Sequence, residues 1–75
     1  MRPIYEIASE IRKDWKNVSP YAEPYLSAMF CLESINDRYG LDSARSIVAY
    51  FLSNASSWRG ETAKRIKAEL RAMCK

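Results

Sequence analysis

Apolar residues recur at steps of three and four along nearly the whole chain, and this spacing restricts the fold more than any other feature. In the first stretch the series is Ile4, Ile7, Ala8, Ile11, Trp15 and Val18. Such spacing places the side chains on one face of an α-helix, whereas a half-buried strand alternates apolar and polar residues. No segment shows that alternation, so the sequence predicts an all-α protein.

Proline and glycine residues divide the apolar series into four predicted helices. Ser19-Pro20 ends the first helix, because proline disfavours the helical conformation at the residue before it. Pro24 suits the first turn of the second helix, and Gly40 is expected to end that helix in a left-handed conformation. Asp42 is expected to cap the start of the third helix. The predicted helices span residues 3–18, 23–39, 42–55 and 60–74.

The later helices carry the rest of the predicted core, in a single domain over residues 1–75. Four short helices suit either an antiparallel bundle or an orthogonal arrangement, and both remain open. A core of this size adds little stability, so we also expect a homo-oligomer. The apolar positions after the first helix are Tyr25, Ala28, Met29, Leu32, Ile35, Tyr39, Ala44, Ile47, Val48, Phe51, Leu52, Ala55, Ala63, Ile66, Leu70 and Met73.

The cysteine, histidine and glycine content disfavours several kinds of chemistry. Cys31 and Cys74 lie far apart in helical patterns, which predicts two packed free thiols rather than a disulfide. The chain has no His, the commonest general base and a frequent zinc ligand. Gly40 and Gly60 are the two glycines, too few for a phosphate-binding glycine loop. We therefore expect no enzymatic activity, no cofactor and no metal site.

Hydropathy bears on where the protein acts. No apolar run approaches the roughly 18 residues that a membrane span requires. The first residues, Met-Arg-Pro-Ile-Tyr-Glu, contain no apolar segment typical of a secretory signal. We therefore expect a cytoplasmic protein without a membrane partner.

Positive charge is concentrated at the C-terminal end. From Arg59 to Lys75 there are six basic and two acidic residues, against six basic and seven acidic residues before that point. Lys64, Lys67 and Arg71 recur at steps of three and four, so they share one helix face. That face suits phosphate groups. The preferred interpretation is nevertheless an ordinary surface helix, which needs a solvated face and gains stability from cations near its C-terminus.

Aromatic and polar residues lead into this basic helix. Tyr50, Asn54 and Trp58 follow one another at helical spacing and are followed by Arg59. Trp, Tyr and Arg dominate the energetics of protein interfaces, and aromatic rings also stack on nucleic-acid bases. Alternatively, Trp58 only packs the third helix against the fourth. The candidate binding surface comprises Tyr50, Asn54, Trp58, Arg59, Lys64, Lys67 and Arg71.

Several segments resemble a small uncharacterised protein family of tailed bacteriophages. These are Ile4 to Ala8, Arg12 to Asn17, and the long stretch from Ile35 to Glu61, with Tyr39-Gly40, Tyr50-Phe51-Leu52 and Ser57-Trp58-Arg59-Gly60 the most similar parts. The resemblance covers nearly the whole chain and implies no activity, ligand or catalytic residue. It implies an accessory role in the cytoplasm of a bacterial host.

Three functions follow from these observations. The first is a non-enzymatic binding protein, a phage accessory or host-interaction factor, that acts through protein–protein contacts with itself or with a host or phage protein. The second is a nucleic-acid-binding accessory that uses the basic helix and Trp58-Arg59. The third is an anti-defence protein that blocks an immune effector or sequesters a nucleotide signal.

Overall fold

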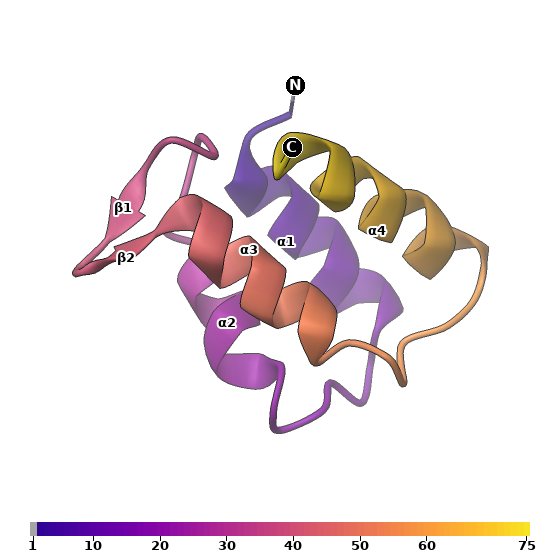
Figure 1. The fold of residues 1–75 in the computed structure, drawn as a ribbon. Coiled ribbons are helices and arrows are strands. Elements are labelled where there is room, and N and C mark those ends of the chain that lie inside the picture. Colours follow the sequence, from indigo (N-terminus) through magenta and orange to yellow (C-terminus); the bar gives the residue numbers. More distant parts are fainter. Residues whose placement is uncertain (1) are drawn as a thin grey trace.

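Four α-helices and one β-hairpin make up the structure of residues 2–75, the part of the chain that the computed structural model describes (Figure 1). Each helix makes its main contacts with two others, in the cyclic order α1, α2, α3, α4 and back to α1. The hairpin lies beside the start of α3. The elements are α1 (Ile4–Asp14), α2 (Glu23–Met29), β1 (Arg38–Tyr39), β2 (Asp42–Ser43), α3 (Ala44–Ser53) and α4 (Glu61–Met73).

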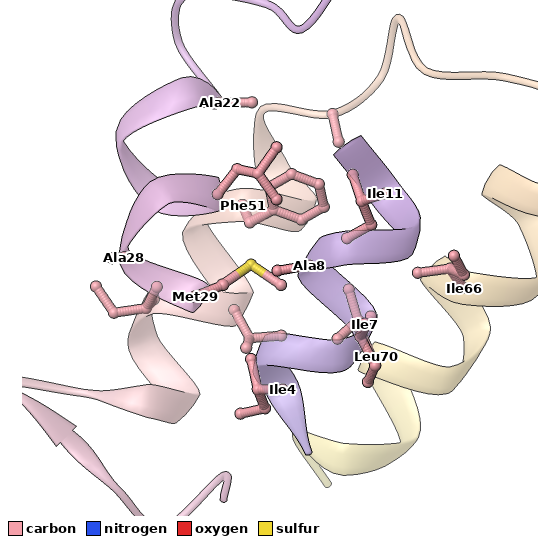
Figure 2. Close-up of a cluster of buried hydrophobic side chains, with 14 of the residues drawn as sticks. Ile4, Ile7, Ala8, Ile11, Ala22, Ala28, Met29, Phe51, Ile66 and Leu70 are labelled. Carbon is pink, nitrogen blue, oxygen red and sulfur yellow. The ribbon is translucent and has the colours of Figure 1, made fainter. Parts of the chain in front are cut away.

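Apolar side chains from all four helices merge into one core (Figure 2). The positions predicted in α1 from Ile4 to Trp15 are all buried, and so are the four predicted in α4. In the third predicted series only Leu52 is partly exposed, and it packs against the edge of the core. Among residues 2–75 no polar or charged residue is buried. Periodicity therefore identified the core of three helices correctly.

The first helix is shorter than predicted, because α1 ends at Asp14 rather than at residue 18. Trp15 leaves the helix with extended backbone dihedrals (φ −95°, ψ 91°), while its N–H still bonds to the Ile11 carbonyl at 2.7 Å. The Trp15 indole stacks on Trp58, with 5.7 Å between ring centroids. Residues after Asp14, predicted to form the last turn of this helix, are therefore not helical, and Trp15 packs on Trp58 instead.

The second predicted helix, residues 23–39, is wrong over its second half. α2 ends at Met29, and the chain then passes the start of α1. There the N–H groups of Ile4 and Tyr5 donate to the carbonyls of Glu33 (2.8 Å) and Leu32 (2.9 Å). The first N–H groups of a helix have no partner within it, so these carbonyls satisfy two of them. These carbonyls thus bond to α1 at positions where the predicted helix would have used them within α2.

Asp37 holds the segment that replaces the predicted helix. Its Oδ2 accepts hydrogen bonds from the backbone N–H groups of Glu33 (2.9 Å) and Ser34 (3.0 Å). These two bonds favour the ionised carboxylate and lower the pKa of Asp37. Its carbonyl accepts from Ala44 N–H at 2.8 Å, which ties the segment to α3.

The β-hairpin corrects the prediction of a purely helical chain. β1 and β2 pair antiparallel, with Arg38 opposite Ser43 and Tyr39 opposite Asp42. Gly40 has a positive φ of 62°, but it opens a two-residue hairpin turn instead of ending a helix. Tyr39, predicted to be buried, is exposed.

The caps and thiols also differ from expectation. Ser43, not Asp42, caps α3, since its Oγ accepts from Ser46 N–H at 3.1 Å. Asp42 instead lies in strand β2, opposite Tyr39. Cys31 is exposed, because the helix that was expected to bury it has already ended. Cys74 is half-buried at the edge of the core, and burial raises the pKa of its thiol.

Substitution of Gly40 tests the hairpin turn. Nothing lies within 4 Å of a Cβ added at this position, so a side chain meets no steric obstacle. The backbone cost of a positive φ remains, and we expect Gly40→Ala to lower the free energy of unfolding by about 1 kcal/mol. Urea denaturation measures this change. Leu41→Ala is the neighbouring control, with an expected effect below about 0.5 kcal/mol, and equal effects would contradict the assignment of the turn.

Candidate functional site

Five of the predicted site residues, four of them cations, line one surface hollow of about 420 Å³. Lys64, Lys67 and Arg71 lie on α4, and Arg59 lies in the connection that precedes it. The single acidic residue in the lining is Glu61. We call this feature the basic hollow, and its lining comprises Trp58, Arg59, Gly60, Glu61, Ala63, Lys64, Lys67 and Arg71.

The cations of the basic hollow lack carboxylate partners. Arg2, Arg12 and Arg65 each form an ion pair with a glutamate elsewhere in the protein. Within residues 2–75, none of the four cations in the hollow forms such a pair. In the described part of the chain, no carboxylate contact therefore neutralises their positive charge.

Lys67 is the most constrained cation in the hollow. Its Nζ donates to the Trp58 carbonyl at 2.6 Å and lies 5.8 Å from the centroid of the Trp58 ring. Burial lowers the pKa of Lys67, and the neighbouring charges of Arg71 and Arg59 lower it further. Burial and the two neighbouring charges all disfavour the charged ammonium group, and a bound anion would favour it.

Trp58 forms part of the core rather than a free recognition surface. Its side chain is only 2% exposed, and its Nε1 donates to Asp14 Oδ2 at 2.8 Å. The ring stacks on Trp15 and meets Phe51 edge-on, with 6.4 Å between centroids. These contacts join the connection between α3 and α4 to the end of α1, so the Trp58 ring offers no open face to a base.

Tyr50 and Asn54 lie apart from the basic hollow and do not line it. Tyr50 is 53% exposed, and its ring lies 5.5 Å from that of Tyr25 on α2. Asn54 Nδ2 donates to the Tyr50 carbonyl at 2.8 Å, at the C-terminal end of α3. The candidate surface predicted from the sequence is thus divided, and the four cations form its continuous part.

The hairpin tip is an exposed apolar feature that the sequence interpretation missed. Leu41 is 95% exposed and follows Gly40 in the turn. Tyr39, on the strand before the turn, is 45% exposed. The signal was available, because a Gly-X pair between short extended segments is typical of a two-residue hairpin. The helical series from Tyr25 to Tyr39 obscured it.

In the part of the chain from Arg2 to Lys75, no group of three or more His, Cys, Asp or Glu residues is placed to hold a metal ion. No helix described there has the length and apolar character needed to cross a membrane.

Comparisons with models of protein families, with curated proteins and with solved structures find no match to this chain.

An ion-pair network joins α1 to α4 next to these surfaces. Glu10 pairs with Arg65 and also with Arg2, at 2.8 Å, and Arg2 continues to Glu69 at 2.8 Å. The hydrogen bond from Arg65 lowers the pKa of Glu10, and that from Arg2 adds to the effect. The hydrogen bond to Glu69 is the main cause that raises the pKa of Arg2.

This network predicts a loss of stability in acid. The pKa of Glu10 is lower in the folded protein than its ordinary value of 4.5. Its contribution is therefore complete above that value and is lost as the pH falls through the folded pKa. We expect the free energy of unfolding, from urea denaturation, to decrease between pH 6 and pH 3. Glu10→Gln should show a smaller decrease, and an identical pH profile would contradict a role for Glu10.

Proposed function

We propose that this protein is a non-enzymatic binding protein that holds nucleic acid through the phosphate backbone at the basic hollow. The observation that carries the proposal is the lining of the hollow, where four cations without carboxylate partners face one acidic residue. Cations paired with carboxylates exchange one ion pair for another on binding. Unpaired cations instead release counterions from the phosphates, which favours association.

The number of cations limits the affinity. Four phosphate contacts correspond to a slope of log affinity against log salt of about −3.6 for duplex DNA and about −2.8 for a single strand. Strong binders make roughly six to ten such contacts. We therefore expect binding that is measurable at low salt and weak at physiological salt, with little preference for sequence.

Fluorescence anisotropy with labelled single- and double-stranded oligonucleotides tests the proposal. At about 50 mM salt, Lys64→Gln together with Arg71→Gln should weaken binding on the order of 100-fold, because two phosphate contacts are lost. The matched control is Lys13→Gln with Lys16→Gln, which removes the same charge outside the hollow. A flat titration of the unmodified protein, or an equal loss in both double variants, would contradict the proposal.

A second candidate function is protein–protein contact, including self-association, through the hairpin tip. It is supported by the exposure of Leu41 and Tyr39 at the end of a hairpin that lies outside the helical core. Size-exclusion chromatography with light scattering should then give a dimer or a larger assembly, which Leu41→Ser reduces to a monomer. A monomer at high concentration would contradict self-association.

The resemblance to a tailed-phage family, and with it an accessory or host-interaction role, stays a prediction. The anti-defence alternative involves the same chemistry, because a sequestered nucleotide signal would also present phosphates to Lys64, Lys67 and Arg71. Unlabelled nucleotides added to the anisotropy assay separate the two cases. Displacement of the oligonucleotide at equal phosphate concentration would favour nucleotide sequestration over binding of a longer strand.

A further inference from the structure

We infer that the basic hollow binds a linear chain of phosphates lying along α4 and does not contact bases. This inference rests on the proposed function and specifies its ligand class. The shared chemistry is a run of singly charged phosphates, whether it comes from a nucleic-acid backbone or from inorganic polyphosphate. Three features of the hollow support it: the row of its charges, the groups it lacks, and the position of Trp58.

The charges form a row rather than a ring. Lys64, Lys67 and Arg71 recur at steps of three and four on α4, which keeps them on one face of the helix. The first and the last are seven positions apart, a rise of about 10 Å along the helix axis. Arg59, in the connection before α4, adds a fourth charge close enough to Lys67 to lower its pKa. A row of this shape matches an extended polyanion better than a single compact anion.

Apart from arginine and lysine, which bind phosphates as well as base edges, the hollow presents few groups that read bases. Specific contacts to base edges use amides, hydroxyls and carboxylates as well as arginine, and single strands stack on exposed aromatic rings. The lining of the hollow contains no amide or hydroxyl side chain, and its one carboxylate is that of Glu61. Its one aromatic residue, Trp58, is buried against Trp15 and Phe51.

Lys67 provides a preorganised contact in the row. The Trp58 carbonyl fixes its ammonium group at 2.6 Å, so little side-chain freedom remains to be lost on binding. The other three cations are exposed and adjust to the spacing of the phosphates. One fixed and three adjustable positive charges favour a ligand with successive negative charges. They do not distinguish one nucleotide sequence from another.

Calorimetric titration of the intact chain at about 50 mM salt tests the inference with three probes. They are an oligonucleotide, an abasic strand of the same length, and inorganic polyphosphate with the same number of phosphates. We expect affinities per strand that agree within about threefold. Arg59→Lys preserves the charge but removes the planar group able to stack on a base, and we expect it to leave the ratio between the first two affinities unchanged.

The outcomes separate this inference from the proposed function. If the oligonucleotide binds at least tenfold more tightly than both the abasic strand and polyphosphate, base-free recognition is overturned and nucleic-acid binding stands. If polyphosphate alone binds, base-free recognition is supported and the proposed function fails. If none of the three probes binds, both are overturned.

Discussion

Replacing Trp58 with alanine is expected to lower the free energy of unfolding by about 3–5 kcal/mol, the range for truncation of a large buried aromatic residue. The Trp58 ring stacks on Trp15, contacts Phe51 edge-on and donates to Asp14 at 2.8 Å. All of these contacts are lost together in the alanine variant. The free energy of unfolding of a small domain is only about 5–15 kcal/mol. Urea denaturation followed by circular dichroism should therefore show a large shift of the midpoint.

Two comparison variants separate the contributions of Trp58. Trp58→Phe keeps a ring in the stack but removes the Nε1 hydrogen bond to Asp14, and we expect a loss of about 1–2 kcal/mol. Tyr50→Ala removes an exposed ring and serves as the control, with a smaller loss than either variant of Trp58. If Trp58→Ala costs no more than Tyr50→Ala, Trp58 does not join α1 to the connection before α4.

Phe51→Ala should have a comparable effect on α3. Phe51 is the largest fully buried side chain in residues 2–75 and meets both tryptophans edge-on, with centroids 6.2 and 6.4 Å away. Its removal leaves a cavity in the core beside Trp15 and Trp58, and we expect the free energy of unfolding, from urea denaturation, to fall by about 3–5 kcal/mol.

Phe51→Leu is the matched control, because it keeps most of the buried apolar volume. We expect it to cost less than about 1.5 kcal/mol, the range for volume-conserving changes. Because Phe51 and Trp58 touch, the double variant should cost less than the sum of the two single alanine variants. Strict additivity would indicate that the three rings do not act as one cluster.

The cations of the candidate site were predictable from spacing, but their lack of partners was not. Steps of three and four place Lys64, Lys67 and Arg71 on one face of α4 in any packing arrangement. Whether a glutamate from another helix reaches them depends on how the helices are arranged. The same sequence could not show that Glu10 pairs with Arg65, 55 residues away in the chain.

Trp58 illustrates the same limit for the aromatic part of the site. Its position between a helix and a basic segment is typical of a recognition residue and equally of a core residue. Trp58 is a core residue because it stacks on Trp15, 43 positions earlier in the chain, with an interplanar angle of 10° between the rings. Local spacing contains no information about such a contact.

The sequence by itself determined three of the helices and most of the core, because a period near 3.6 places apolar side chains on one face wherever the helix lies. Tertiary structure decided the rest. The predicted helix over residues 23–39 ends at Met29, since the carbonyls of Leu32 and Glu33 accept hydrogen bonds from the start of α1. That contact joins residues nearly 30 positions apart, and local periodicity cannot specify it. The basic hollow combines both levels: the spacing on α4 sets the row of charges, and the packing of Trp58 leaves that row without an aromatic face.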